Sequence, residues 1–435
     1  MRKKLISIFL LILMLTVFYN QIAIAKKTGY ITTISDTELT KFKDLTVQDK
    51  IVDMLDKINY SLVYHYHQKL MSFGPRYTGS KNCSDAGDYI YNAFDDIGLE
   101  VSFHHWQFNG FKSRNIEATL EGTQENSSIF IISAHYDCTP SSLGADDDAS
   151  GVAAILALAD VMSGYYFNNT IRFLAVSGEE VGTYGSFCYA KDAYKNKDNI
   201  RAVLNLDMIG YANSTEGGKK LRFHFVKRSE WIVDSAIKIS EKYEHILGMK
   251  VEGRPNYRGS DHQAFIDYGY DGVWIAHVDS YPWANTPGDT PDHLNWSYQV
   301  NATKLMLVIL SEMADEKIDL QIYLRKPFEG YTYLFGRPFF KLDFFGKYWV
   351  LDLRGATFLL GKTKAEAEVI TDEEIEYVVF CINNDFISFD YEPPYTCEIK
   401  CRFVPLFGKY ILRAYAYSKS GNVAVDEMDI IAFSS

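Results

Sequence analysis

The most regular feature of the sequence is a series of short, mostly apolar runs separated by longer stretches. Residues 129–134 (IFIISA), 171–177 (IRFLAVS) and 202–206 (AVLNL) are rich in aliphatic, often β-branched side chains. Such runs are typical of parallel strands that are buried on both faces. Residues 151–162 (GVAAILALADVM), between the first two runs, have the length and composition of a helix. This alternation predicts an α/β fold: a mixed, mostly parallel sheet with helices on both faces, in three layers.

Weaker periodic segments surround these runs. Apolar positions at helical spacing predict a helix over 48–71, and strands are expected at 100–106 and 116–121. Near residue 318 the pattern changes to short strands separated by turn residues. The clearest of these strands are 365–370, 376–381, 397–403, 410–417 and 423–433, with a hairpin turn at 419–422. This final region predicts an all-β antiparallel sandwich.

The first 25 residues have the pattern of a signal peptide. Three basic residues at 2–4 precede the mostly apolar run 5–18, and Ala23-Ile24-Ala25 forms an A-x-A cleavage site. The apolar run is shorter than the about 20 residues that a membrane span needs. We therefore expect a mature chain that begins near Lys26 and is secreted or associated with the cell surface. An uncleaved membrane anchor is the alternative.

Size and charge narrow the possible functions. A chain of 435 residues is too long for one ordinary core, so we expect a catalytic domain at 26–317 and an accessory domain at 318–435. The formal net charge of −12 disfavours nucleic acid and anionic lipid as partners. Three of the six cysteines fall in each domain, so they cannot all pair within their own domains. The disulfide pattern stays open.

Potential metal ligands follow each of the three apolar runs. In chain order they are His135 and Asp137, then Glu179 and Glu180, then Asp207. Three consecutive aspartates, 146–148, precede the predicted helix. The carboxyl ends of parallel strands meet at one edge of the sheet, where α/β proteins form their sites. Imidazole and carboxylate groups are suitable ligands for zinc.

Each of these motifs has an ordinary structural explanation when taken alone. A single HxD pair is usually surface, and aspartates before a helix usually cap its N-terminus. A glutamate pair is usually solvated, but Glu179 and Glu180 directly follow a buried strand and a glycine. The HxD pair, the three aspartates, the glutamate pair and Asp207 all lie close to strand ends. Together these four groups of potential ligands predict a metal site.

The motifs resemble those of zinc aminopeptidases of the aminopeptidase Y and Streptomyces aminopeptidase type. The similarity runs from FGPRYTGS at residue 73 through AHYD, GADDDASG, SGEE, NLDMIGY and GSDHQAF to NTPGDTPDHLN, about 220 residues in all. These enzymes share their fold with glutamate carboxypeptidase and glutaminyl cyclase. The resemblance implies a zinc-dependent exopeptidase that acts on peptides, with an aminopeptidase expected first.

The resemblance also assigns roles to individual residues. His135 and Asp207 would bind one zinc, Glu180 would bind a second, and Asp147 would bridge the two. Glu179 would be the general base that takes a proton from a zinc-activated water and passes it to the leaving amine.

Two further acidic residues receive supporting roles from the same resemblance. Asp137 would orient His135, as ligand histidines usually require. Asp261 would lie near the site without binding metal.

One motif departs from the family. The family carries a histidine in a Tyr-His-Thr-x-x-Asp-Thr motif, whereas residues 284–290 read ANTPGDT, so Asn285 takes the histidine position. An amide oxygen is a poor zinc ligand beside an imidazole, and we expect one tight zinc and a weak second site. His277 or His293 could supply the missing imidazole. Glutaminyl cyclases depend on the altered site, so the departure favours a peptidase.

The C-terminal region resembles the small immunoglobulin-like sandwiches attached to secreted microbial enzymes. Pro393-Pro394-Tyr395, Phe407-Gly408-Lys409 and the final hairpin turn carry this resemblance. It implies a module that contacts a cell surface or a glycan, or that shields the catalytic domain. A non-catalytic binding relic and an acyl transferase of the cyclase kind are the alternative functions. Retention of Glu179 favours the active peptidase, because a relic has no reason to keep the base.

Overall fold

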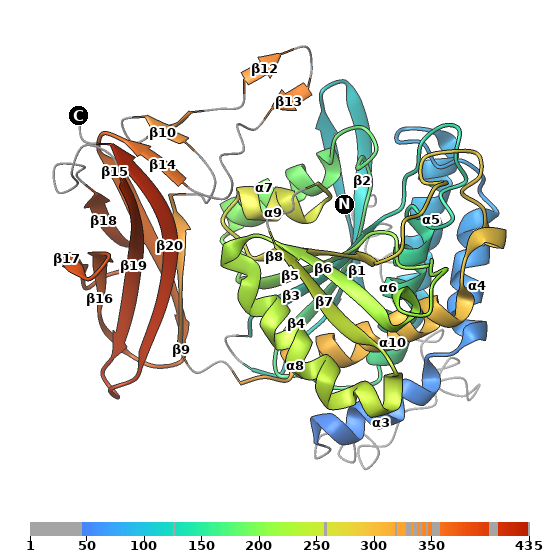
Figure 1. Cartoon of the computed structure of the whole chain (residues 1–435), viewed down its shortest axis with the longest axis horizontal. Helices are drawn as coiled ribbons and strands as arrows, with labels where there is room; N and C mark the ends of the chain where they lie inside the picture. The colour runs from blue at the N-terminus through green and yellow to red at the C-terminus, as the bar shows by residue number, and fades with distance from the viewer. Residues whose placement is uncertain are drawn as a thin grey trace, which may run out of the picture. The chain divides into compact units, whose positions relative to one another are not determined.

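The computed structural model supports the predicted α/β fold with separate C-terminal β-sheets (Figure 1). The described residues are 46–124, 127–255, 259–317, 320–327, 332–334, 337–339, 342–344, 347–349, 357–399 and 408–433. The signal peptide expected at residues 1–25 lies outside them. No described helix has both the length and the apolar character that crossing a bilayer requires.

An eight-stranded sheet forms the α/β core. Its strands are β1 (Glu100–Phe108), β2 (Phe111–Leu120), β3 (Ile129–His135), β4 (Thr170–Val176), β5 (Ile200–Leu206), β6 (Lys220–Phe225), β7 (Lys250–Pro255) and β8 (Gly272–His277). They are ordered β1-β2-β4-β3-β5-β8-β6-β7. Strands β4, β3, β5 and β8 are parallel neighbours, and antiparallel pairings join β2 and β6 on either side. All seven side chains of β3 are buried, as its apolar run predicts.

Helices cover both faces of this sheet. They are α3 (Val47–Lys57), α4 (Tyr60–Met71), α5 (Lys81–Ile97), α6 (Ala149–Met162), α7 (Tyr184–Asn196), α8 (Glu230–Leu247), α9 (His262–Asp267) and α10 (Trp296–Ala314). On one face, α9 packs Phe265 into the same cluster as Ile131 and Leu174. On the other face, the ring of Phe94 in α5 lies 6.3 Å from that of Phe173. Neighbouring strand residues point to opposite faces, so the three layers are confirmed.

The helical structure predicted over 48–71 is confirmed, but the segment is not continuous. It is divided into α3 and α4, with the break at Ile58 and Asn59. Asn59 has an extended backbone (φ −141°, ψ 172°), and its side-chain oxygen accepts a hydrogen bond from the N–H of Leu62 at 3.1 Å. An asparagine side chain competes with the helical backbone in this way and starts a new helix.

The C-terminal strands form three sheets. They are β9 (Leu320–Lys326), β10 (Thr332–Leu334), β11 (Arg337–Phe339), β12 (Leu342–Phe344), β13 (Lys347–Trp349), β14 (Thr357–Leu360), β15 (Thr363–Thr371), β16 (Ile375–Ile382), β17 (Asp385–Asp390), β18 (Tyr395–Ile399), β19 (Gly408–Ser418) and β20 (Val423–Phe433). A seven-stranded sheet (β11-β10-β14-β20-β19-β16-β17) and a three-stranded sheet (β18-β15-β9) contribute to one core. Leu324 and Ala367 from the smaller sheet pack with Phe380 and Leu412 from the larger.

The expectation of a purely antiparallel sandwich is wrong. Strand β14 pairs in parallel with both β10 and β20. The hairpin between β19 and β20 is confirmed: Gly421 has a φ of +93°, and its N–H donates to the carbonyl of Ser418 at 3.0 Å. Only glycine adopts such a φ without steric cost. The five described cysteines are all free thiols, and Cys401 lies outside the described residues.

Candidate metal centre

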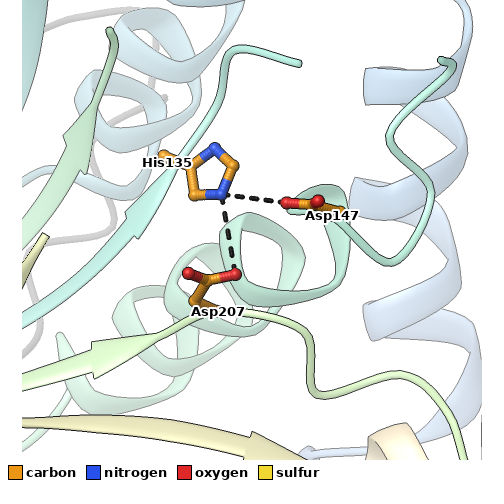
Figure 2. A group of neighbouring side chains, drawn as sticks. All are labelled: His135, Asp147 and Asp207. Carbon is orange, nitrogen blue, oxygen red and sulfur yellow. Dashed lines mark ion pairs between the residues drawn. The ribbon is translucent and has the colours of Figure 1, made fainter. Parts of the chain in front are cut away.

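Three side chains from separate elements meet at the carboxyl edge of the sheet (Figure 2). His135 ends β3, Asp207 follows β5, and Asp147 lies just before α6. Nε2 of His135 lies 3.2 Å from Oδ1 of Asp147 and 3.6 Å from Oδ1 of Asp207. Strands β3 and β5 are parallel neighbours, so their ends bring these ligands together. The sequence predicted this convergence.

The cluster has the dimensions of a zinc site. The three ligand atoms lie within 4.8 Å of one another, and all three residues are buried. Ligand atoms about 2.1 Å from a tetrahedral zinc lie roughly 3.4 Å apart, between the two distances from His135. Nε2 of His135 has no hydrogen-bond partner, although buried polar atoms normally have one. An imidazole facing two buried carboxylates therefore fits a divalent cation such as zinc.

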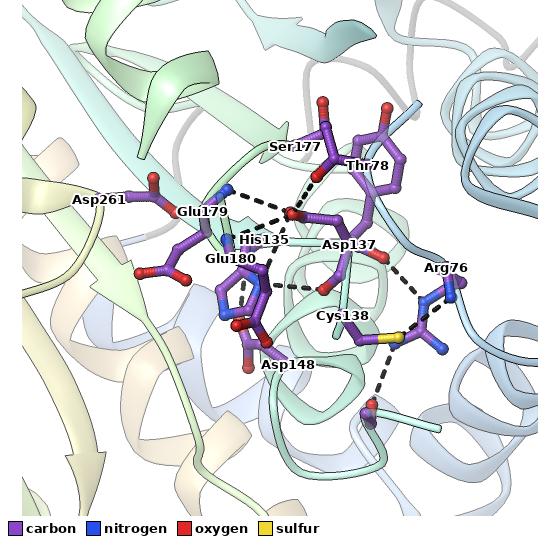
Figure 3. A network of polar contacts seen from close by, with 12 residues as sticks. Arg76, Thr78, His135, Asp137, Cys138, Asp148, Ser177, Glu179, Glu180 and Asp261 are labelled. Carbon is purple, nitrogen blue, oxygen red and sulfur yellow. Dashed lines mark hydrogen bonds and ion pairs between the residues drawn. The ribbon is translucent and has the colours of Figure 1, made fainter. Parts of the chain in front are cut away.

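Asp137 supports this cluster, but mainly through its backbone. Nδ1 of His135 donates to the carbonyl oxygen of Asp137 at 3.1 Å, whereas the Asp137 carboxylate is 3.8 Å away. That carboxylate instead accepts hydrogen bonds from the N–H groups of Glu179 and Glu180, each at 3.3 Å, and from the Thr78 hydroxyl at 2.6 Å (Figure 3). Asp137 therefore connects the loop after β3 to the loop after β4.

A buried chain of hydrogen bonds orients Asp207. The hydroxyl of Ser260 donates to Oδ2 of Asp207 at 2.5 Å and accepts from the amide of Asn205 at 2.8 Å. The Asn205 oxygen in turn accepts from Ser133 at 2.9 Å. With Oδ2 occupied in this way, Oδ1 of Asp207 is the oxygen that faces His135.

The three consecutive aspartates point in different directions. Asp148 accepts hydrogen bonds from the N–H groups of Gly151 (3.0 Å), His135 (3.2 Å) and Met208 (3.2 Å), so it caps α6 and joins three segments. Asp146 accepts from the N–H of Gly210 at 2.8 Å. Of the three, only Asp147 enters the ligand cluster.

Asp289 holds the backbone of this aspartate loop. Its carboxylate accepts from the N–H groups of Asp146 at 2.8 Å and Asp147 at 3.2 Å, and from the hydroxyl of Tyr281 at 2.7 Å. Burial raises the pKa of Asp289 to about 6. It belongs to the motif that departs from the family, and its structural role was not foreseen from the sequence.

Arg76 is a second contributor that was not foreseen. Its guanidinium is wholly buried and donates to three carbonyls: Tyr136 (2.8 Å), Leu143 (2.8 Å) and Gly144 (3.0 Å). Gly144 has a φ of +61°, and a Cβ there would lie 2.5 Å from the carbonyl of Asp147. The first motif of the resemblance, FGPRYTGS, contains Arg76 and therefore shapes the loop that carries Asp147.

Glu179 and Glu180 lie beside His135 in poorly hydrated surroundings (Figure 3). Burial raises the pKa of Glu179 well above its ordinary value. Burial and the nearby carboxylate of Asp147 raise the pKa of Glu180 to about 8. Oε1 of Glu180 is buried without a hydrogen-bond partner, yet Glu180 is not part of the three-ligand cluster.

Asn285 contacts the cluster as a donor. Its side-chain nitrogen donates to Oδ2 of Asp147 at 3.1 Å, and its backbone has a φ of +59°. The structure thus brings Asn285 to the position that the sequence predicted, but its amide nitrogen, not its oxygen, faces the carboxylate.

Neither candidate replacement histidine reaches the cluster. Nε2 of His277 lies 3.1 Å from Oδ2 of Asp146, the aspartate that points away from the ligands. His293 donates from Nδ1 to the carbonyl of Gly288 at 2.7 Å and stacks on Trp283 with ring centres 3.7 Å apart. The His277 imidazole therefore faces Asp146, and the His293 imidazole is engaged by Gly288 and Trp283.

Asp261 lies near the cluster without entering it. Oδ1 accepts a hydrogen bond of 2.5 Å from the hydroxyl of Ser186. Burial raises the pKa of Asp261 to about 7. The supporting role that the resemblance implied for Asp261 stays a prediction.

The region that contains these residues matches known proteins. Residues 115–310 match the family described as Peptidase family M28. A probable zinc metalloprotease of Pyrenophora tritici-repentis is 30% identical over 200 residues, which cover 39% of this chain and 41% of that protein. Leucine aminopeptidase 1 of Sclerotinia sclerotiorum is 28% identical over 301 residues, covering 63% of this chain and 76% of that protein. The chain spans about two fifths of the length of several such relatives.

Solved structures agree on the fold. BSAP, a zinc aminopeptidase from Bacillus subtilis, superposes with a TM-score of 0.54 and 16% identity, over 60% of this chain and 96% of that one. A glutaminyl cyclase of Bacteroides thetaiotaomicron superposes with a TM-score of 0.52 and 21% identity, over 60% of this chain and 99% of that one. At these identities the similarity extends to the fold, which peptidases and cyclases share.

Proposed function

We propose, because residues 115–310 match the family described as Peptidase family M28, that this protein is a secreted zinc aminopeptidase that removes N-terminal residues from peptides. The observation that carries the proposal is the buried cluster of His135, Asp147 and Asp207 at the carboxyl edge of the sheet. Its spacing suits zinc, and its position is where α/β proteins place their chemistry.

The ligand cluster and Glu179 have different proposed roles in the reaction. Zinc bound there would lower the pKa of water and polarise a peptide carbonyl. Glu179 is the proposed general base: it accepts the proton of the attacking water and then delivers it to the leaving amine. Its raised pKa suits this exchange, because a base must be able to hold the proton between the two steps.

We propose one tightly bound zinc. His135, Asp147 and Asp207 supply its three protein ligands. A second metal would depend on Glu180 and on Oδ2 of Asp147, and that oxygen accepts a hydrogen bond from Asn285. A carboxylate oxygen engaged by an amide is a weaker metal ligand, so a second ion binds weakly or not at all.

The alternative activities are less well supported. The fold is compatible with a glutaminyl cyclase, but the metal position expected for cyclases is the one that Asn285 alters. A non-catalytic relic would not need a partly buried glutamate of raised pKa beside an intact ligand cluster. Peptides are therefore the proposed substrates.

Aminopeptidase activity is tested with a panel of aminoacyl 4-nitroanilides and the same compounds acetylated at the α-amine. The free-amine substrates should be hydrolysed and the acetylated ones should not, and dialysis against a zinc chelator should abolish turnover. A His135→Ala variant should lose both zinc and activity. Equal hydrolysis of the acetylated compounds, or chelator-resistant turnover, would contradict the proposal. Conversion of a glutaminyl peptide to its pyroglutamyl form would indicate a cyclase.

Secretion has its own test. The A-x-A pattern before Lys26 predicts cleavage there. N-terminal sequencing of protein recovered outside the producing cells should start at or near Lys26. A retained Met1 would contradict cleavage.

A further inference from the structure

The outer face of the seven-stranded sheet carries an unusual set of apolar side chains. Alternate residues are buried in the sandwich core, so the odd-numbered residues between them face outward; the buried ones are Val378, Phe380 and Ile382 of β16 and Leu412, Ala414 and Ala416 of β19. Directly paired outward residues form two rows across neighbouring strands. One row is Val423, Tyr417 and Tyr377, and the other is Val425, Tyr415, Val379 and Phe389.

A β-bulge adds a further aromatic residue to this face. Phe380 pairs with Ser388 but Cys381 pairs with Phe386, so Ile387 is an extra residue in β17. The extra residue places Phe386 and Phe389, three apart in sequence, on the same side of the strand.

Five aromatic rings join into a continuous line, here called the aromatic track. Ring centres are 5.8 Å apart for Phe386 and Phe389, 5.2 Å for Phe389 and Tyr391, 6.2 Å for Tyr391 and Tyr377, and 4.9 Å for Tyr377 and Tyr417. Successive rings are tilted by 35° to 75°. The track therefore offers alternating ring faces and edges along a line, not one flat plane.

Three of the five track rings, Phe386, Phe389 and Tyr391, are exposed to solvent, and the sheet face around them carries further exposed apolar side chains. Of the nine large hydrophobic side chains that are exposed among the described residues, five lie on this sheet face or at its edge. They are Phe386, Phe389, Tyr391, Val423 and Val425, each 52% to 59% exposed. Exposed apolar patches of this kind mark interaction sites.

A second copy of this chain is a poor partner for the β17 edge. Strand β17 is the last in its sheet, and its sequence, Asp385-Phe-Ile-Ser-Phe-Asp390, reads almost the same in both directions. Antiparallel pairing of two copies would place Asp385 opposite Asp390 at both ends, where like charges repel. The bulge at Ile387 further opposes edge pairing.

Charge and size argue against two other partners. Exposed carboxylates of Asp385 and Glu392 directly neighbour Phe386 and Tyr391 of the track in sequence, and they repel anionic lipid. Five side chains about half exposed present on the order of 500 Å², less than the about 800 Å² per partner of a stable protein interface. A narrow ligand that needs only a line of rings fits better.

We propose that the aromatic track binds a single chain of an uncharged polysaccharide. The C–H faces of sugar rings pack on tyrosine and phenylalanine rings, and the tilts suit a twisted chain better than a flat crystalline surface. Sugar hydroxyls can donate to the carboxylates of Asp385 and Glu392 and to the tyrosine hydroxyls. This site goes beyond the peptidase function and does not depend on it.

The test is native gel electrophoresis of the full-length protein in gels containing soluble uncharged polysaccharides: hydroxyethyl cellulose, laminarin, soluble starch and galactomannan. At least one should retard the protein. The double variant Phe389→Ala/Tyr391→Ala should weaken that binding about tenfold or more, since it removes two stacking rings. Both side chains are exposed, so the variant should fold. Its peptidase activity should equal that of the wild type.

The matched control is Tyr60→Ala, which removes a tyrosine of similar exposure (52%) from α4. It should leave the retardation unchanged. No retardation by any of the four polysaccharides, or equal retardation of the double variant, would overturn the proposal. So would binding to phosphatidylglycerol vesicles, or a dimer in sedimentation equilibrium, if either is lost in the double variant. The first outcome would reassign the track to membranes and the second to self-association.

Discussion

The side-chain amide of Asn285 donates a 3.1 Å hydrogen bond to Oδ2 of Asp147, while Oδ1 of Asp147 faces Nε2 of His135. The two oxygens of one carboxylate therefore have different surroundings. One belongs to a cluster with the dimensions of a zinc site, and the other is held by a neutral donor. This asymmetry leads directly to a prediction about metal content.

Purified wild-type protein should retain one zinc after dialysis against a mild chelator, and Asn285→His should retain close to two. The substituted imidazole would be a metal ligand beside Asp147 and Glu180, where the Asn285 amide is a hydrogen-bond donor. Binding of a second metal requires such a ligand. The measurement is zinc per protein by elemental analysis, so it does not depend on activity. His135→Ala serves as the control that loses the first ion. Two tightly held zincs in the wild type would show that Asn285 does not impair a second site.

Replacing Glu179 by glutamine should lower kcat by about 10² to 10⁴ while leaving zinc content unchanged. Glutamine keeps the shape of the side chain but cannot accept the proton. Activity and elemental analysis on the same preparation measure both quantities. Glu230→Gln, at the start of α8, is the control and should behave as wild type. Turnover close to the wild-type rate in the Glu179 variant would remove this residue from the general-base role.

Arg76→Lys should destabilise the protein by about 3 kcal/mol, because a lysine cannot replace all three buried hydrogen bonds to carbonyls. Zinc affinity should fall as well, since those carbonyls shape the loop that presents Asp147. Urea unfolding and zinc titration measure the two effects. The control is Arg114→Lys, because a pair with the half-exposed Asp88 should be worth less than about 1 kcal/mol. Equal effects of the two substitutions would argue against a special role for Arg76.

His67 should make stability depend on pH. Its Nε2–H donates to the carbonyl of Ala145 at 2.8 Å, and burial lowers the pKa of its imidazole to about 4. The unfolded state, with a pKa near 6.5, binds the proton more readily, so stability falls as pH decreases from about 6.5 to about 4. The slope should be about 1.4 kcal/mol per pH unit within that window.

The matched variant for this effect is His67→Gln, whose amide can still donate to Ala145 but does not titrate. Urea unfolding of zinc-free protein at pH 7.5, 6.5 and 5.5 gives the two stability curves. The wild type should lose stability relative to His67→Gln as the pH falls. Parallel curves would show that His67 is not buried in its neutral form.

A chain that ends at Lys317 should fold and keep its zinc. All proposed ligands precede that residue, and the end of α10 retains its anchors: Lys50 pairs with Asp315 at 3.1 Å, and Asn169 donates to the carbonyl of Glu316 at 2.8 Å. A shorter chain that ends at Ser311 lacks both anchors and should melt at a lower temperature. Precipitation or zinc loss in the longer truncation would mean that the predicted boundary at 317 is misplaced.

Much of the fold could be predicted from the sequence, because buried strands and helices are composed of apolar side chains. The apolar runs that became β3, β4 and β5 are buried strands, and their ends carry His135, Glu179 and Asp207. Parallel strands share an edge, so convergence of ligands at that edge follows from local pattern alone. Asn59 shows the limit of this reasoning, since the same apolar spacing continues through a residue that ends one helix and caps the next.

The direction in which each side chain points could not be predicted from the sequence. Asp146, Asp147 and Asp148 are identical in type and adjacent, yet one pairs with His277, one enters the ligand cluster and one caps α6. Their directions are set by Arg76 and Asp289, which hold the loop from about 70 residues before it and 140 after it.

The amino-acid sequence therefore specified the ligand types and the edge where they meet, because strand burial and strand order are expressed in local composition. The tertiary structure decided which oxygen of Asp147 faces His135. It also decided that Asn285 presents its nitrogen to Asp147, a residue about 140 positions away. Backbone dihedral angles and distant hydrogen bonds orient a carboxylate or an amide, and neither is encoded in the residue type. Only the folded chain brings those partners together.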